Sequence, residues 1–429
     1  MTRAGFTLWA VLLLGAPFGQ AGATSLDHAG RLLVANDTAG ARAAVDALVV
    51  TTPQEEAEAL WILALSHMRE DAPRAALPHL ERLVTLAPDV PRFRLELARA
   101  LFLVEQDDRA RFHFESALAG QLALPEIQAV NQYLDAIEKR KSWQGHVTFA
   151  FVPQSNPTRA SAETEVLVGN VLPIPLAQAR KDMGLDVGLG VTWLPKLSDD
   201  WRARLHVMGT GSLYRDDALN RFQIVTELGV LHLGDQGAQV GGGIALQAAF
   251  GDSGRIMQGV GVYATVQQRF GARTQMQVRV SADRLTYPGV PQMDGMRYAA
   301  HAQVQHILSP QLRVDGALSL SRHNAQADFN KRSDVRLRAG VSYALPGGVT
   351  TGLSASLGQT RFGAPNPLLP QYAAARDTHL GLTATFLHRD FTVQGFAPVL
   401  EIGAERQSSN IPMRAFSNLR ASIGASRNF

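Results

Sequence analysis

Three residue types that can form a hydrolytic site occur in the second half of the chain. Ser281, His301 and Asp315 could supply a nucleophile, a general base and an orienting carboxylate, because a serine hydroxyl attacks a carbonyl only when a nearby base accepts its proton. The sequence has no Gly-x-Ser-x-Gly turn to present such a serine. All three residues lie on polar faces of alternating stretches, where these residue types are ordinary. We therefore expect no catalytic site, and a protein that is not an enzyme.

Metal and phosphate chemistry are also poorly supported. Cysteine is absent, and the histidines lack the His-Glu-x-x-His spacing of a zinc site; those considered are His206, His301, His306, His379 and His388. Gly241-Gly242-Gly243 lies inside an alternating stretch, whereas a phosphate cradle precedes a helix, so we interpret it as a packing or bending feature. No phosphate loop of the GxxxxGK type occurs, and no cofactor is expected.

The composition excludes two broad classes of protein. A net charge of +3, with no Lys/Arg run longer than three residues, gives no basic stripe, so we expect no nucleic-acid partner. The mean hydropathy of −0.04, with no apolar run of about eighteen residues outside the extreme N-terminus, excludes a protein built from membrane-spanning helices. With 429 residues, the chain is long enough for two or more domains.

The polar faces belong to extended stretches, and the clearest of these is 273–287. Val278 and Val280 fall on one side of a strand, and Gln277 and Arg279 fall on the other. A strand of about ten residues that is apolar on one face and polar on the other is typical of a barrel in a lipid bilayer. An edge strand of a soluble sandwich would give the same pattern, so the decision depends on how often it recurs.

The pattern recurs to the end of the chain, in about fourteen stretches. Their approximate spans are 143–152, 183–194, 201–214, 221–234, 237–250, 256–270, 273–287, 296–308, 311–322, 332–345, 348–361, 376–388, 391–405 and 416–429. Tight turns alternate with longer links, as in outer-membrane barrels, whose periplasmic turns are short. The last stretch ends on Phe429, a terminal aromatic resembling the signal read by the bacterial barrel-assembly machinery. We predict a 14-stranded antiparallel transmembrane β-barrel over residues 141–429, in the Gram-negative outer membrane.

Residues 1–23 are typical of a signal peptide. Arg3 precedes an apolar core at 6–18, and Ala21-Gly22-Ala23 forms a small-x-small cleavage site. An uncleaved anchor helix is the alternative, but the core is short for one and Pro17 interrupts it. The sequence therefore predicts export from the cytoplasm.

Residues 24–140 follow a helical period and a longer period of about 34 residues. Ala64 is matched by Ala98, Ala76 by Ala110, and Leu80 by Phe114, while Ala29 and Ala41 fit an earlier, weaker unit. Small residues at these places allow two helices to approach closely, as in tetratricopeptide repeats, which this region resembles. We predict three repeats capped by a helix at 125–140. The whole is an α + β two-domain membrane protein: an α-helical tetratricopeptide-repeat solenoid in the periplasm followed by the barrel.

Such a solenoid has a concave groove lined by the first helix of each pair. An exposed apolar strip with arginines suits an extended or partly folded polypeptide. The alternative is that its aromatic residues only pack between repeats. The predicted client-binding groove consists of Trp61, Leu65, Met68, Arg69, Arg92, Leu95, Arg99, Phe102 and Leu103.

The combination resembles the surface lipoprotein assembly modifier (Slam) family over nearly the whole mature chain. Two short segments also resemble the family, Pro153-Gln154-Ser155-Asn156-Pro157 and 406–412, the second containing Ser408-Ser409-Asn410. Gln154 and Pro157 depart from the family pattern, which bears on subfamily and substrate.

The resemblance implies an outer-membrane translocation factor that helps deliver specific lipoproteins or secreted proteins to the cell surface, with the repeats binding the client. The implied partners are this client, outer-membrane lipid and the barrel-assembly machinery. An exopolysaccharide export porin and a passive outer-membrane channel are the alternatives. A client could cross through the lumen or along an opening between the first and last strands.

Overall fold

The computed structural model describes residues 23–118, 120, 122–140, 142–168, 171–234, 237–271, 273–389 and 391–428. The predicted signal peptide lies outside these residues except for Ala23, and so does the terminal Phe429. The chain divides into two compact units, Met1–Ala87 and Pro88–Phe429. The second unit combines three helices with the barrel, whereas the sequence predicted a boundary at residue 140.

The described part of the first unit consists of helices α1 (Ala23–Val34), α2 (Thr38–Asp46), α3 (Pro53–Arg69) and α4 (Pro73–Leu86). The start of α3 follows from its sequence. The Thr52 hydroxyl accepts from Glu55 N, and the Glu55 carboxylate accepts from Thr52 N, which is a capping box. Pro53 then occupies the first helical position, where its missing N–H costs nothing.

Helices of both units pack as consecutive pairs, α1 with α2, α3 with α4, and α5 (Pro91–Leu103) with α6 (Asp107–Leu118). The alanines that the 34-residue period placed at close approaches have no exposed surface; they are Ala29, Ala41, Ala64, Ala76, Ala98 and Ala110. The predicted packing of three helix pairs is therefore confirmed at these residues. Membership of the tetratricopeptide family stays a prediction.

Helix α7 (Leu124–Arg140) closes the helical part of the second unit. Its Tyr133 ring stacks on Phe114, with centroids 4.9 Å apart, and meets Phe102 edge-on at 5.1 Å. Arg140 lies over the Phe102 ring and pairs with Asp107 of α6. Among the described residues, no helix has the length and apolar character needed to cross a bilayer.

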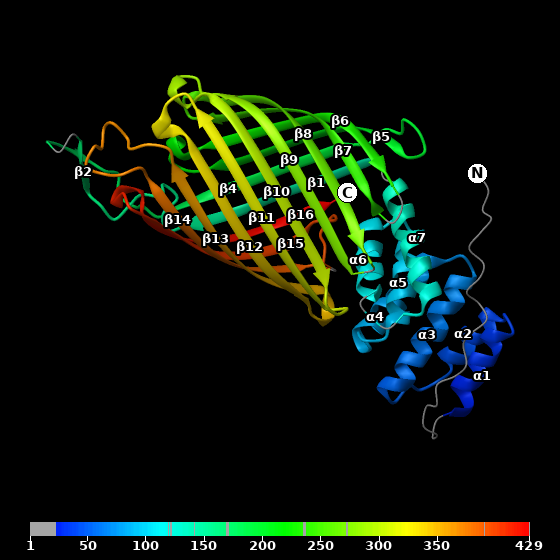
Figure 1. Ribbon diagram of the computed structural model, residues 1–429. Helices are drawn as coiled ribbons and strands as arrows, with labels where there is room; N and C mark the ends of the chain where they lie inside the picture. Colours follow the sequence, from blue (N-terminus) through cyan, green and yellow to red (C-terminus); the bar gives the residue numbers. More distant parts are fainter. Residues whose placement is uncertain are drawn as a thin grey trace. The chain divides into compact units, whose positions relative to one another are not determined.

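Fourteen antiparallel strands form a closed barrel in which β1 pairs with both β4 and β16 (Figure 1). The strands are β1 (Trp143–Gln154), β4 (Asp182–Trp193), β5 (Trp201–Leu213), β6 (Arg221–Leu233), β7 (Gln239–Gly251), β8 (Gly254–Phe270), β9 (Thr274–Thr286), β10 (Gly295–Ile307), β11 (Leu312–Ala325), β12 (Arg332–Ala344), β13 (Val349–Phe362), β14 (Arg376–His388), β15 (Ala397–Ser409) and β16 (Phe416–Asn428). Closure gives each of these fourteen strands a partner strand on both sides.

The alternation of residue types explains which face of each strand points outward. Val280 of β9 is 47% exposed on the outer face, whereas Asp283 is buried on the lumen side. Apolar residues that are exposed in this way contact acyl chains, and polar residues face the lumen. The predicted 14-stranded barrel is confirmed.

The largest difference from the predicted spans is at β15, which begins at Ala397 instead of residue 391. Phe391 and Val393 continue the apolar alternation, which made this segment look like part of the strand. Gln394 and Gly395 have φ values of 53° and 82°, and Val393 forms an isolated bridge with Phe396. These left-handed positions make a turn, so the strand starts after them.

The two ends of the barrel differ. Connections at the end where α5–α7 lie, the helical end, are 194–200, 234–238, 271–273, 308–311, 345–348 and 389–396. Connections at the opposite loop end are 155–181, 214–220, 252–253, 287–294, 326–331, 363–375 and 410–415. Short 3-10 helices occur in these connections: η1 (Asp217–Leu219), η3 (Pro291–Met293), η4 (Asp328–Asn330), η5 (Pro346–Gly348) and η6 (Pro412–Arg414).

Three connections of the loop end fold together, and we call 155–181, 363–375 and 410–415 the loop cap. The first contains the hairpin β2 (Glu165–Val168) and β3 (Leu172–Pro175), at the end of the barrel away from α5–α7 in Figure 1. A small apolar core joins the three connections, formed by Val166, Leu369, Ala375 and Ile411. Arg414 also binds the buried Asp377 of β14 at 2.6 Å. These contacts hold the loop cap on the barrel.

Candidate functional site

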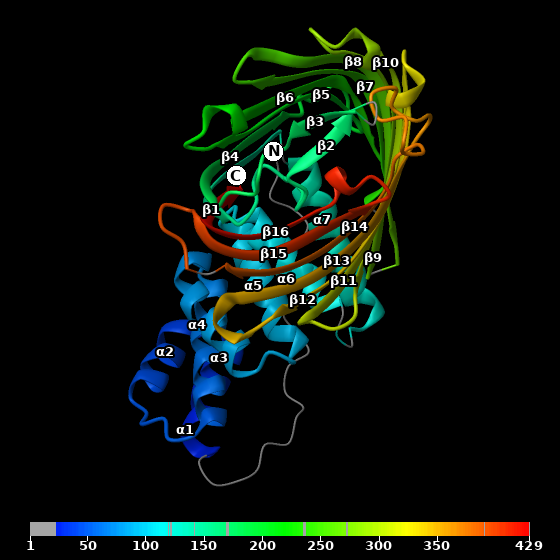
Figure 2. The same ribbon diagram turned by 90° about the vertical axis from the view of Figure 1, so that its left-hand side faces the viewer.

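Helix α6 is attached to the barrel by Arg313, the second residue of β11. Its guanidinium forms an ion pair with Glu115 at 3.2 Å and donates to Phe112 O and Ser116 Oγ at 3.4 Å each. The same group lies over the Phe112 ring, 4.7 Å from its centroid. Arg313 therefore fixes the second half of α6 at the helical end of the barrel (Figures 1 and 2).

The C-terminus of α6 is held by Arg273, in the turn between β8 and β9. Its guanidinium donates to Leu118 O at 3.2 Å and to Gly120 O at 3.3 Å. Carbonyl groups at the end of a helix lack intrahelical partners and carry partial negative charge. A cation at this position therefore supplies the missing hydrogen bonds and a favourable field.

Two further turns of the helical end contact the same helix pair. Gln311, between β10 and β11, donates to Asp89 Oδ1 at 2.8 Å. Arg389, which follows β14, lies over the Phe112 ring, 4.1 Å from its centroid. Arg313 contacts the same ring. The helix pair is thus held by turns from three separate strand pairs, which together fix its position on the rim.

The first half of α6 faces the opposite wall of the barrel. Asp108 and Arg111 line a cavity of about 560 Å³ together with lumen residues of β1, β4 and β5, among them Gln144, His146, Thr148, Gly188, Gly190, Thr192 and His206. Counted around the fourteen strands of the barrel, β10 is seven strands away from β1, which is half of the circumference. Strands β10 and β11 therefore lie opposite β1. Helix α6 therefore reaches across the opening at the helical end, which we call the barrel mouth.

Two basic side chains are buried where α5 and α6 meet the rim. Arg94 is 5% exposed and donates to Pro88 O at 3.0 Å. Burial, together with Arg389, lowers the pKa of Arg94 to about 10, so it remains charged at neutral pH. Burial and the surrounding arginines hold the pKa of His113 well below its usual value, so His113 is neutral in this contact.

One wall of the lumen is lined by paired charges. Glu227 of β6 binds Arg204 and Arg279, and Arg204 also donates to Tyr263 Oη at 2.9 Å. Next to this cluster, Arg297 and Asp283 pair at 3.1 Å. Because the acids are buried between arginines, these cross-strand pairs stiffen the wall formed by β5–β10.

The wall formed by β16, β1 and β4 is lined mainly by small residues. The lumen positions of these strands include Thr148, Ala150, Gly188, Gly190, Ser422, Gly424 and Ser426. Small side chains leave space next to the wall, and the cavity below Asp108 lies there. The wall contains the closing pair of the barrel, β1 and β16, which we call the seam.

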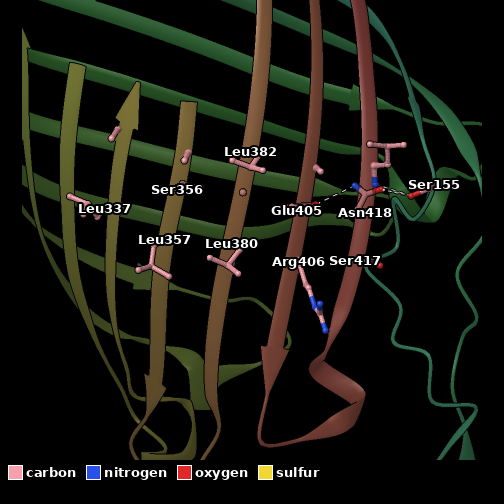
Figure 3. A pocket seen from close by; sticks show the side chains of 15 residues that line it. Ser155, Leu337, Ser356, Leu357, Leu380, Leu382, Glu405, Arg406, Ser417 and Asn418 are labelled. Carbon is pink, nitrogen blue, oxygen red and sulfur yellow. Dashed lines mark hydrogen bonds between the residues drawn. The ribbon is translucent and has the colours of Figure 1, made fainter. Parts of the chain in front are cut away.

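The loop end of the seam is held by one buried amide. Asn418 is 4% exposed, and its Nδ2 donates to Gln154 Oε1 at 2.8 Å and to Glu405 Oε1 at 3.2 Å. Its Oδ1 accepts from Asn156 N at 2.9 Å and from Ser155 Oγ at 3.3 Å (Figure 3). The amide uses both its donors and its acceptor, so it fixes the first loop of the barrel to the last strand.

Just below this amide, the seam has a gap in its pairing. Residues 146–151 of β1 pair with β16, and pairing resumes at Gln154, so Val152 and Pro153 are skipped. Ser155 N donates to Leu419 O at 2.9 Å. Because hydrogen-bonded pairs recur at every second residue of an antiparallel ladder, residue 153 should also donate its N–H to β16. Pro153 has no N–H and cannot form this bond. The seam is therefore weaker below the amide of Asn418.

The nine residues of the predicted groove are all partly or fully exposed. Trp61, Leu65, Met68 and Arg69 belong to the first unit, and Arg92, Leu95, Arg99, Phe102 and Leu103 belong to the second. Leu65 packs against the core of α1–α3, and Phe102 contacts Tyr133, so these two also have packing roles. Arg69 donates to Leu33 O, and Arg99 pairs with Glu96 at 3.5 Å. Binding of a client by these residues stays a prediction.

The three residues considered for hydrolysis do not meet. Ser281 donates to Asp283, His301 contacts Ser319 Oγ at 2.9 Å, and Asp315 pairs with Arg338 at 3.9 Å. Gly243 is explained by packing, because a Cβ there would collide with Leu228 O of the neighbouring strand. The triplet at 241–243 thus serves close strand contact.

Sequence reasoning missed the residues that attach α6 to the rim and that hold the seam. Arg273, Arg313 and Arg389 stand at or next to tight turns of one barrel end, and that shared position is the only signal they leave in the sequence. Asn418 carries no signal of its own. The segment Gln154-Ser155-Asn156, singled out for its resemblance to a family motif, proves to be its partner.

A closed barrel with an apolar outer surface, a polar lumen and helices at one end is an outer-membrane β-barrel protein. The sequence profile of the family described as Surface lipoprotein assembly modifier matches residues 143–429, and the chain belongs to this family.

The chain is also similar to individual proteins and to solved structures. It is 21% identical over 360 residues to Surface lipoprotein assembly modifier 1 of Haemophilus influenzae, covering 80% of this chain and 71% of that protein. It is 24% identical over 295 residues to the Hemophilin secretion modulator of Acinetobacter baumannii, covering 61% and 57%. It also resembles the crystal structure of the outer membrane channel DcaP of Acinetobacter baumannii, with a TM-score of 0.42 and 11% identity over 67% of this chain and 96% of that one.

Proposed function

We propose that the chain is an outer-membrane translocation factor that delivers specific lipoproteins or secreted proteins to the cell surface. The observation that carries this proposal is α6, which links a helical region to the barrel and reaches across its mouth. A passive channel would not need such a helix. The names of two relatives, a surface lipoprotein assembly modifier and a secretion modulator, support the same class of activity.

The proposed orientation places the helical end in the periplasm. The turns at that end are short, and the loop cap is at the other end, as expected for outer-membrane barrels. A chain in this orientation would be inserted by the barrel-assembly machinery after export. The helices would then meet a client before it reaches the membrane, and the predicted groove residues on α3 and α5 would bind it.

The proposed path for the client runs past α6 and along the wall of small residues. This wall leads from the cavity under Asp108 and Arg111 towards the weak part of the seam at Pro153. An extended polypeptide would find space there, whereas the opposite wall is closed by charge pairs such as Glu227 with Arg279. No catalytic step and no cofactor are part of the proposal.

The test is surface display in a strain that lacks this gene and carries a lipoprotein or secreted client. Protease added to intact cells measures how much client is exposed. We expect display with the full chain and loss of display without it. If the client is equally exposed in the deletion strain, the proposed function is wrong.

Two truncations separate client binding from mouth closure. Removal of 24–87 deletes the first unit only and leaves α5–α7 on the rim, so we expect an inserted, closed barrel that no longer displays the client. Removal of 24–140 also deletes α6, so we expect an inserted barrel with an open mouth and no display. Display that survives both truncations would contradict a role for the helices.

A further inference from the structure

Arginines occupy the outer face of the barrel near the loop end. Arg322 of β11, Arg361 of β13 and Arg376 of β14 lie in one lateral row, since Arg322 faces Ser333, Ser333 faces Arg361, and Arg361 faces Arg376. Each arginine is an even number of residues away from lipid-facing leucines of its own strand, such as Leu357 of β13, and so lies on the same face. All three arginines are exposed. The row therefore faces the bilayer, not the lumen.

Arg361 and Arg376 form a close pair of like charges. Phe362 N donates to Ala375 O at 2.9 Å, so the adjacent pair Arg361–Arg376 is a non-hydrogen-bonded pair, in which side chains come closest. Like charges directly opposite each other are destabilising. Within the described ranges, neither arginine forms an ion pair with an acid of this chain. An external anion between them would remove the repulsion.

A hydrophobic hollow lies below this pair on the same strands. It has a volume of about 690 Å³, and Leu337, Leu357, Leu380, Leu382 and Leu419 line it on the lipid-facing side (Figure 3). Leu357 and Leu380 stand four residues from Arg361 and Arg376 respectively, about 14 Å along the strands. Ala339, Ala355 and Ala404 form its floor, and the exposed Arg406 lies at its edge.

We propose that this surface is a binding site for a phosphorylated lipid of the outer leaflet. Arg361 and Arg376 bind the phosphate, and the acyl chains fill the leucine hollow. Guanidinium groups bind phosphate through paired N–H donors, and lipid headgroups attract arginines at this depth. The Gln359 and Asn324 side chains, which accept from Arg361 and Arg322 at 2.9 Å, orient the guanidiniums of the row.

The assignment of this lipid to the outer leaflet rests on the proposed orientation of the barrel. Binding of the lipid does not depend on whether the protein translocates a client. The experiment uses the full chain in detergent micelles and native mass spectrometry. The probes are bisphosphorylated lipid A and the same lipid with its phosphates removed. We expect retention of the phosphorylated lipid about tenfold above that of the dephosphorylated lipid. Equal retention of the two lipids by the wild-type chain overturns the proposal.

Variants locate the site. Arg361→Gln with Arg376→Gln should lower retention of bisphosphorylated lipid A about tenfold. The matched control, Arg336→Gln with Arg338→Gln, removes two charges from the lumen face of β12 and should leave retention unchanged. Equal losses in both double variants would show nonspecific charge attraction and overturn the site.

A last variant tests the hollow. Ala355→Leu fills its floor without changing charge, so we expect weaker retention of the acylated lipid and unchanged binding of inorganic phosphate. Unchanged lipid retention would show that the site binds phosphate alone, which would overturn the assignment of the hollow. Loss of surface display has no bearing on these outcomes, so failure here is distinguishable from failure of the proposed function.

Discussion

Arg313 of β11 and Glu115 of α6 form an ion pair at 3.2 Å, and each side chain is only 17% exposed. The pair joins a residue at the rim of the barrel to a helix that reaches across the mouth. Partial burial reduces screening by salt, and the hydrogen bonds from Arg313 to Phe112 O and Ser116 Oγ add fixed geometry. A helix held in this way has a fixed position across the mouth.

Loss of this contact should open the channel. Arg313→Ala removes the ion pair and leaves Glu115 without it, which costs about 2 kcal/mol at the contact. We expect higher conductance of the purified protein in planar bilayers. Arg336→Ala, a lumen arginine away from α6, is the matched control and should keep the wild-type conductance. Wild-type conductance in Arg313→Ala would show that this contact alone does not hold α6 across the mouth.

Docking of α6 should weaken at acid pH. His113 faces Arg94, Arg109, Arg313 and Arg389, and its pKa in the docked helix lies well below its usual value of about 6.5. Below pH 6.5 the released helix therefore binds a proton that the docked helix excludes, so docking loses free energy as pH falls. Above pH 6.5 His113 contributes no pH dependence.

The measurement is hydrogen exchange of α6 between pH 7.5 and 5, corrected for the intrinsic exchange rate. Protection should fall at the acid end by up to about 2 kcal/mol. His113→Phe keeps a ring of similar shape and should remove the pH dependence. If His113→Phe loses as much protection at acid pH as the wild type does, groups other than His113 cause the pH dependence.

The seam should depend on Asn418. Asn418→Ala leaves Gln154, Glu405 and Asn156 N without their shared partner, and unsatisfied buried polar groups cost about 1–3 kcal/mol. We expect the folded band on unboiled gels to be lost at a lower temperature. The control, Asn428→Ala, removes an exposed contact with His146 at the other end of the seam and should have little effect.

The barrel was predictable because its signal is repeated. The alternation in 273–287 predicts one strand, and thirteen similar stretches predict the others. A sheet of fourteen strands can pair its two edge strands only by closing into a barrel. The helix pairs were predictable for the same reason, since Ala64 and Ala98 mark equivalent close approaches. The false start of β15 at residue 391 shows the limit, because the turn at Gln394 depends on backbone conformation that alternation does not encode.

The contacts between distant segments were not predictable. Arg313 pairs with a residue 198 positions away, and Asn418 bonds to Gln154 across 264 positions. Single polar residues at such separations follow no period, and a lumen arginine looks the same whether it pairs within the wall or with a helix. Closure of the barrel brings Asn418 to Gln154, and the contact of α6 with the rim brings Glu115 to Arg313.

The seam gives the sharpest test of the client's path, and the absence of cysteine makes it practicable. Thr148 and Ser426 face each other on the lumen side in a non-hydrogen-bonded pair, so Thr148→Cys with Ser426→Cys should form a disulfide across the seam. A client that leaves through the seam is then blocked, and reductant restores display. The control pair Thr383→Cys with Gly403→Cys has the same geometry on β14 and β15 and should not block display. Display that continues with the seam cross-linked would place the whole path inside the lumen.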